Sequence, residues 1–145
     1  MLVRDILKIK GTKAYSISPD KTVFEAISKM DKLNIGALLV MNNQKLEGMI
    51  SERDYRSKVI LKGRTSKNTK TSEIMSKQVF SVTPLDSVEN CMRIMTDKKI
   101  RHLPVLEGSD VVGVVSIGDL VKAIISKQKG EISSLRQYIQ GGYPL

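Results

Sequence analysis

Apolar residues recur with helical spacing in two stretches of the chain. The two sets are Val23, Ala26, Ile27 and Met30, and Val88, Cys91, Met92 and Met95. In each set the later residues follow the first by three, four and seven positions. This spacing puts the members of each set on one helix face. Each stretch is therefore predicted to be a helix with one buried side. Ser18-Pro19 and Thr83-Pro84 precede the two helices, and each pair is predicted to supply a hydroxyl N-cap followed by proline at the first helical position.

Shorter apolar runs predict strands on both sides of these helices. The runs "AYSI" and "VFSV" come before them, and "ALLVM" with "LEGMIS", or "HLPVL" with "VVGVVS", come after. The segments "NNQ" and "EGSD" that join the later runs have the composition of hairpin loops. A second helix is predicted to begin at Glu52 and again at Ile117. Each half of the chain thus predicts the unit β-α-β-β-α, which gives an α+β fold class.

The two units are related by an internal repeat. A shift of 65 residues superposes residues 15–55 on 80–120 without a gap, and ten positions are identical. A unit of about 60 residues buries too little surface to be stable alone, so we expect the two to pack face to face about a pseudo-two-fold axis. The expected division is residues 1–64 for repeat 1, 65–126 for repeat 2, and 127–145 for a C-terminal helix and tail. The polar stretch "KGRTSKNTKTSE" (62–73) is predicted to be the linker.

The last part of the chain has no counterpart after the first repeat. A helical apolar pattern continues to the "GGYPL" ending, through Ile124, Ile125, Ile132, Leu135 and Ile139. Gly130 is predicted to interrupt this helix, and the glycines and proline of the ending to stop it. An unmatched apolar helix most simply packs against a partner subunit, although it could also cap its own domain.

The composition is that of an ordinary globular protein, with 41% hydrophobic and 27% charged residues among 145. No apolar run approaches the roughly 20 residues that span a bilayer, and the charged N-terminus is unlike a signal peptide, so we expect an intracellular, cytoplasmic protein. Cys91 is the only cysteine, which excludes an intramolecular disulfide and the usual multi-cysteine zinc sites, and no metal site is expected. A formal net charge of +9 favours anionic partners.

Both repeats carry serine and aspartate three residues apart where a strand is predicted to meet a helix: Ser51 with Asp54, and Ser116 with Asp119. A nucleophilic serine is excluded, because the G-x-S-x-G pattern is incomplete and repeat 1 has no histidine. The spacing is that of a helix capping box. In both repeats a glycine three residues before the serine leaves room for close approach to the backbone. A carboxylate in this position could also accept the hydroxyls of a ribose, while free helix amides take phosphate oxygens.

With these motifs at constant offset, the chain resembles a pair of cystathionine β-synthase (CBS) domains, the Bateman module. The resemblance rests on the doubled unit, on "NIGALLV" and "IRHLPVL" as central strands, and on "GMISERD" and "GVVSIGD" at the strand-to-helix turns. "SERDYRSKVILKGRTSKNTK" and "LRQYIQGGYP" look similar to stand-alone two-CBS proteins of bacteria and plant organelles. The resemblance implies a flat homodimer whose clefts bind AMP, ADP, ATP, NAD(H) or S-adenosylmethionine.

The resemblance also assigns residues to two clefts. In the main cleft Asp119 would hold the ribose with Ser116, and the remaining wall would come from Thr12, Ile35, Gly36, Ala37, Val114 and Gly118, with phosphate contacts from Arg53, Arg101 and His102. The second cleft would contain Ser51 and Asp54, with Lys77 or Gln78 on its wall. Because an arginine gives phosphate strong charge-assisted hydrogen bonds, the Asp119 cleft is expected to bind more tightly. The Asp54 cleft could bind more weakly, take a second adenosine ligand, or stay empty.

Three functions are compatible with a chain of this kind. The expected one is a non-catalytic regulatory module that senses adenine nucleotides and signals to an unidentified protein. The charge also permits nucleic-acid binding, against which stand 4% aromatic residues and basic residues scattered over both repeats. An enzyme is not expected, because the sequence lacks a Walker loop, G-x-G-x-x-G, a metal-ligand cluster and a catalytic pair.

Overall fold

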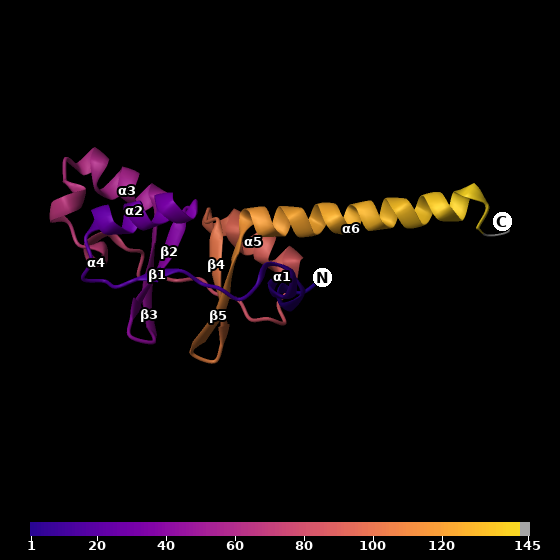
Figure 1. The fold of residues 1–145 in the computed structure, drawn as a ribbon, viewed down its shortest axis with the longest axis horizontal. Helices are drawn as coiled ribbons and strands as arrows, with labels where there is room; N and C mark the ends of the chain where they lie inside the picture. Colours follow the sequence, from indigo (N-terminus) through magenta and orange to yellow (C-terminus); the bar gives the residue numbers. More distant parts are fainter. Residues whose placement is uncertain (143–145) are drawn as a thin grey trace.

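The structure, a computed structural model, describes residues 1–142 and contains two halves side by side, with one long helix projecting from the second (Figure 1). The elements of the first half are β1 (Ser16–Ile17), α2 (Val23–Leu33), β2 (Ala37–Asn42), β3 (Lys45–Ser51) and α3 (Glu52–Lys58). Those of the second half are α5 (Val88–Lys98), β4 (His102–Glu107), β5 (Asp110–Ser116) and α6 (Ile117–Gln137). In the sequence, helix α1 (Val3–Lys10) precedes the first half, α4 (Thr71–Ile74) comes between the two sets of elements, and a π-helical turn (Tyr138–Gly142) follows α6. The predicted α+β class and doubled unit are confirmed.

The two central hairpins have the same strand register. In the antiparallel pair β2–β3, Ala37 lies opposite Ser51, and in β4–β5 His102 lies opposite Ser116. Each hairpin also has one register shift, at corresponding places in β2 and β4. The 65-residue offset of the sequence therefore appears as a structural repeat in which both serines end a strand beside the start of its partner.

The first strand of the unit is shorter than predicted, and in the second half it is reduced to one bridge. β1 pairs in parallel with β2, whereas "VFSV" contributes the single bridge Val82–Val105. Val82 still donates to the Pro104 carbonyl at 3.1 Å and accepts from Leu106 at 2.8 Å, so the segment occupies the place of β1 without adding a second pair.

Helices α2 and α5 begin later than the Ser-Pro and Thr-Pro pairs indicated. Their N-caps are Thr22 and Ser87, whose hydroxyls accept from the amide three residues on at 3.1 Å and 3.0 Å. Ser18 and Thr83 instead open tight turns, in which their carbonyls accept from the amide three residues later at 3.2 Å and 3.1 Å. Proline is well suited to the second position of such a turn, which explains why the pair does not start the helix.

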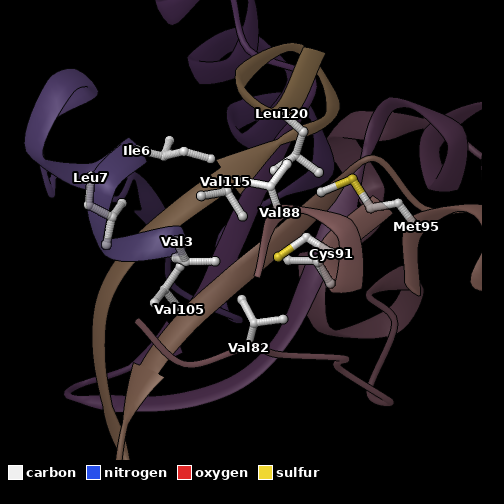
Figure 2. Close-up of a cluster of buried hydrophobic side chains, with 11 residues drawn as sticks. Val3, Ile6, Leu7, Val82, Val88, Cys91, Met95, Val105, Val115 and Leu120 are labelled. Carbon is white, nitrogen blue, oxygen red and sulfur yellow. The ribbon is translucent and has the colours of Figure 1, made fainter. Parts of the chain in front are cut away.

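The two hydrophobic cores do not follow the division of the chain at residue 64. Val3, Ile6 and Leu7 of α1 point into the core of the second half (Figure 2). Conversely, Ile74 of α4 belongs to the core of the first half. The short helix that precedes each repeat thus buries its apolar face in the other one, so the division into 1–64 and 65–126 describes the chain but not its two packed units.

The predicted linker is more ordered than its composition suggested. A short 3₁₀ turn at 60–62 leads into it, a second at 66–68 lies within it, and α4 begins at its end. Thr69 and Thr71 are 1% and 0% exposed, and the Val23 amide donates to the Thr69 carbonyl at 2.8 Å. The Thr69 hydroxyl donates to the Thr65 carbonyl at 2.7 Å, which satisfies a buried polar group. Residues 69–74 are therefore anchored to the first half.

Helix α6 runs without interruption through Gly130, contrary to the prediction. Space around Gly130 is open, and a glycine in an exposed helix costs about 1 kcal/mol relative to alanine without breaking the helix. Of the predicted stop signal, residues 143–145 lie outside the described residues. α6 leaves the second half and extends well beyond it (Figure 1).

Candidate functional site

A cavity of about 680 Å³ lies where the two halves meet. In the first half its wall comes from Ala37 of β2, the β3–α3 junction and residues 75–76, which lie beside β3. Residues 77–80, 98–100 and 102 form the rest of the wall. This volume is in the range of small-molecule sites. Because both halves contribute, a molecule bound here would touch both, and we refer to this space as the Asp54 cavity.

Asp54 lies at the start of α3, in a capping box with Ser51. The Asp54 carboxylate accepts from the Ser51 amide at 2.9 Å and from the Ser51 hydroxyl at 3.1 Å, while the Asp54 amide donates to the Ser51 hydroxyl at 3.3 Å. The other carboxylate oxygen pairs with Lys58 at 3.0 Å, one helical turn on. The predicted cap is thus present, and it holds the carboxylate at the cavity wall.

Basic residues from both halves line the same cavity as this carboxylate. The cations on the wall are Arg53, Lys58, Lys77, Lys98 and Lys99. Arg53 donates to the Lys99 carbonyl at 3.2 Å, and the Lys98 ammonium lies 5.0 Å from the centre of the Phe80 ring. Five cations against one carboxylate make the cavity suited to a polyanion, and these charges come from separate elements.

Apolar groups complete the wall. They are Ala37, Met49, Met75, Val79, Phe80 and Ile100. An apolar surface beside a carboxylate and several cations is the combination that a nucleotide requires, because its base is flat and weakly polar, its ribose donates hydroxyls and its phosphates are anionic.

The equivalent carboxylate of the second repeat has a different partner. Asp119 accepts from the Ser116 amide at 2.8 Å, and its amide donates to the Ser116 hydroxyl at 3.2 Å. The same carboxylate oxygen is 2.7 Å from the ammonium of Lys10, at the end of α1, and that ammonium also donates to the Val114 carbonyl at 2.9 Å. Partial burial acts to raise the pKa of Asp119, but hydrogen bonds from Lys10 and Ser116 outweigh it and the pKa is lowered.

Gly48 and Gly113, which were expected to let a ligand approach the backbone, are instead approached by other parts of the protein. A Cβ on Gly113 would lie 2.7 Å from the side chain of Leu7, and one on Gly48 would lie 2.7 Å from the Ser76 carbonyl. These positions therefore accommodate the exchanged segments around α1 and α4, which explains their identity in the two repeats without a ligand.

His102 lies on the wall of the Asp54 cavity, opposite Gly36 across the two halves. A Cβ on Gly36 would be 3.4 Å from the imidazole. Burial lowers the pKa of His102, and Lys10 lowers it further, against the opposing effect of Asp119 and Glu52. The imidazole therefore binds a proton less readily than a free histidine, in a position that feels Lys10 and Asp119 of the second site and Glu52 of the first half.

Several of the residues expected in the Asp119 cleft line the Asp54 cavity: Arg53, His102 and Ala37. Face-to-face packing sets the start of β4 opposite the start of α3. His102 also lies opposite Ser116 and feels the charge of Asp119, so it borders both sites, and its assignment to a ligand stays a prediction. Lys77 and Gln78 lie on the wall of the Asp54 cavity, as expected.

The other residues expected in the main cleft lie around the second carboxylate or between the halves. Val114 contacts Lys10 through its carbonyl, and Gly118 is exposed in the first turn of α6. Thr12 is exposed in the segment after α1, and Arg101 is exposed while its carbonyl accepts from Ile117 at 2.8 Å. Ile35 is partly buried and packs against the first core.

Sequence reasoning missed the lysine partners of both carboxylates. Lys58 could have been found, because it stands four residues after Asp54 on the predicted helix. Lys10 is 109 residues from Asp119, and no local pattern connects them. Lys98 and Lys99 belong to a helix end whose orientation depends on the packing of the halves.

The described residues contain no group of three or more histidine, cysteine, aspartate or glutamate side chains placed to hold a metal ion. None of the helices in the described part of the chain combines the length and hydropathy needed to cross a membrane.

Comparisons with known proteins agree with this fold and its repeat. The mitochondrial CBS domain-containing protein CBSX3 of Arabidopsis thaliana is 41% identical over 97% of this chain and 73% of its own length. The solved structure of a signal-transduction protein with CBS domains from Burkholderia ambifaria is similar, with a TM-score of 0.85 and 43% identity, covering 88% of this chain and 96% of that one. Because the Arabidopsis relative is mitochondrial, a cytoplasmic location for the present chain stays a prediction.

A more distant structure shares the fold and contains ligands. The CBS domain pair of protein MJ0100, crystallised with 5′-methylthioadenosine and S-adenosyl-L-methionine, is 24% identical with a TM-score of 0.74, over 88% of this chain and 98% of that one. The CBS domain family matches the present sequence twice, at residues 3–60 and 72–126. The chain therefore belongs to the CBS domain family and consists of a tandem pair of these domains.

Proposed function

We propose that this protein is a non-catalytic regulatory module that binds an adenine nucleotide in the Asp54 cavity. The observation that carries the proposal is the composition of the cavity wall, where a capped carboxylate, an apolar surface and five cations face one space. Asp54 would accept the ribose hydroxyls, and the apolar groups would hold the base. The cations contributed by both repeats would bind the phosphates. The MJ0100 pair supports this use of the fold, since it accommodates adenosine compounds.

The ligand class follows from the charge of the wall. AMP, ADP, ATP and NAD(H) carry phosphates, whereas S-adenosylmethionine carries a cationic sulfonium that would meet repulsion from Lys98 and Lys99. We therefore rank ATP and ADP above AMP, and S-adenosylmethionine last. The Asp119 cleft is proposed as a second adenosine site that opens when Lys10 leaves the carboxylate.

Regulation would result from the placement of the cavity between the repeats. A nucleotide that binds Asp54 on one half and Lys98 or Lys99 on the other favours the arrangement in which both contacts form. The nucleotide shifts the equilibrium between this arrangement of the repeats and one in which only one contact forms, by the difference between its affinities for the two. The protein that the module regulates is unidentified. We also propose that the module forms a homodimer.

Calorimetry on nucleotide-stripped protein tests the binding step. ATP, ADP, AMP, NADH and S-adenosylmethionine are titrated into the wild type, into Asp54→Asn and into the matched control Asp110→Asn, which changes an exposed hairpin carboxylate. We expect Asp54→Asn to weaken ATP binding by about 10- to 100-fold, because charge-assisted hydrogen bonds to the ribose are lost. Asp110→Asn should bind as the wild type does. Absence of heat with every nucleotide, or equal affinity in Asp54→Asn, would contradict the proposal.

A second pair of variants tests the phosphate contacts. Lys98→Gln with Lys99→Gln should weaken ATP more than adenosine, whereas Lys127→Gln on α6 should affect neither. Nucleic-acid binding is the less favoured function, and a salt-dependent gel shift that ATP does not compete away would support it instead.

A further inference from the structure

An apolar stripe follows one face of helix α6 into the π-helical turn after it, mostly on the part that leaves the second half. Its members follow one another at alternating intervals of four and three residues: Val121, Ile125, Gln128, Ile132, Leu135 and Ile139. Exposure rises along the stripe, from 42% at Val121 to 51% at Ile132 and 65% at Ile139. Ala123 and Ile124 are the last α6 residues packed against the core of the second half. An alternation of four and three is the a and d pattern of a coiled coil, with a single polar residue, Gln128, within it.

The exposed stripe leaves most of α6 without support from its own subunit. The helix has 21 residues, of which those after Ile124 extend into the open (Figure 1). A helix of this length with a glycine in its middle is marginal when isolated in water. Burial of the stripe against a matching helix would supply the missing stabilisation, and a self-complementary stripe is matched by a second copy of itself.

The charges beside the stripe decide the orientation. With Ile125 and Ile132 at a, the e positions are Lys122, Lys129 and Arg136. In an antiparallel pair e positions face each other, so these cations would repel. In a parallel pair each e position faces the g position five residues earlier on the other helix. Glu131 occupies g, so Glu131 of one copy would meet Arg136 of the other, twice by symmetry.

We propose that α6 pairs in parallel and in register with α6 of a second copy of this chain, through the part of the stripe within the helix, from Val121 to Leu135. Within the described residues, neither Glu131 nor Arg136 makes an ion pair in the single chain. The pairing specifies which surface the homodimer uses, and it stands independently of nucleotide binding in the Asp54 cavity.

Analytical ultracentrifugation of Ile132→Glu with Leu135→Glu is the first test. Both side chains are exposed in the monomer, so the fold should persist, while in the pair four carboxylates would enter an apolar seam. We expect the dimer dissociation constant to rise by about 10-fold or more. The matched control, Ser126→Glu with Ser133→Glu, adds the same charges to the outer face and should leave the dimer unchanged. An equal dissociation constant for the stripe variant and the wild type would overturn the proposal.

A charge exchange tests the register independently of the apolar stripe. Arg136→Glu alone and Glu131→Arg alone should each weaken the dimer by about 2- to 10-fold, because two like-charge contacts replace two ion pairs. The double variant should restore it. Single variants without effect, or a double variant weaker than both, would contradict the in-register arrangement.

Cysteine crosslinking tests the orientation, whatever other surfaces the dimer uses. Ile125→Cys and Leu135→Cys, an a and a d position that would face each other in an antiparallel pair, are prepared separately and oxidised, with buried Cys91 retained. A parallel pair gives a homodisulfide in each variant, since equal residues face each other. An antiparallel pair gives a disulfide only when the two variants are mixed. Absence of both homodisulfides would overturn the proposal even if the protein remained dimeric.

Discussion

The ammonium of Lys10 lies 2.7 Å from the Asp119 carboxylate, although the two residues are 109 positions apart. Helix α1 brings them together because its apolar face is buried in the core of the second half. The corresponding carboxylate in the first half, Asp54, takes its lysine from its own helix. The two sites that the sequence repeats are therefore not equivalent, and the difference originates in the exchanged helix.

Replacement of Lys10 should release the second carboxylate for a ligand. We expect Lys10→Met to strengthen nucleotide binding at the Asp119 cleft by about 5-fold, since a partly exposed ion pair no longer competes for the carboxylate. Calorimetry in the Asp54→Asn background isolates this cleft from the cavity. Lys8→Met, an exposed lysine on the same helix, is the control. Weaker binding in Lys10→Met would show instead that Lys10 is itself a ligand contact.

Substitution of the repeated glycines should destabilise the protein to different extents. An alanine at Gly48 meets the backbone carbonyl of Ser76, whereas one at Gly113 meets the flexible end of Leu7. We expect Gly48→Ala to lower the free energy of unfolding by about 1–3 kcal/mol and Gly113→Ala by less, because a side chain moves more easily than the main chain. Urea denaturation measures both effects.

Gly130→Ala serves as the control with the opposite sign. Nothing lies within 4 Å of a Cβ at this position, so alanine should raise helix stability by up to about 1 kcal/mol. If Gly48→Ala were as stable as the wild type, the close packing of residues 75–76 against β3 would not hold in solution.

Much of the fold was predictable because its signals are local and occur twice. The apolar stripe that begins at Val23, the hairpins and the Ser-Asp caps depend on residues within one element, and all were predicted. The start of α2 was predicted too early from Ser18-Pro19, because the same pair suits a turn as well as an N-cap. The 65-residue repeat then doubled each observation, which allowed the architecture to be inferred.

The grouping of the site residues was less predictable, because it depends on contacts between the halves. Arg53 and His102 were assigned to the Asp119 cleft by resemblance; both line the cavity that contains Asp54, and His102 also lies opposite Ser116. No pattern within either repeat specifies which face of the other it meets. Lys10 shows the same limit, since its partner depends on where α1 is packed.

Cys91 should be chemically inert in the folded protein. The side chain is 0% exposed, and burial raises the pKa of the thiol to about 11, with Asp86 acting in the same direction. The reactive thiolate is therefore scarce at pH 8. We expect no reaction with a thiol reagent such as Ellman's until the protein unfolds, and one thiol per chain in denaturant. Rapid labelling of the native protein at pH 8 would show that the second core opens readily.

Acidification should destabilise the protein through His102. Its pKa is lowered in the folded state by burial and by Lys10, so the folded protein binds a proton less well than the unfolded chain. The stability associated with the neutral imidazole is complete above the unfolded pKa of about 6.5, and it is lost as the pH falls below that value toward the folded pKa. Urea midpoints at pH 7.5 and 5.5 measure the loss. His102→Gln should decrease it, because glutamine does not titrate, whereas an equal loss in His102→Gln would assign the effect to other groups.

A bound nucleotide adds negative charge beside the imidazole and favours its protonated form. ATP should therefore reduce the loss in the wild type, and calorimetry at pH 6 in buffers of different ionisation enthalpy should detect proton uptake on binding.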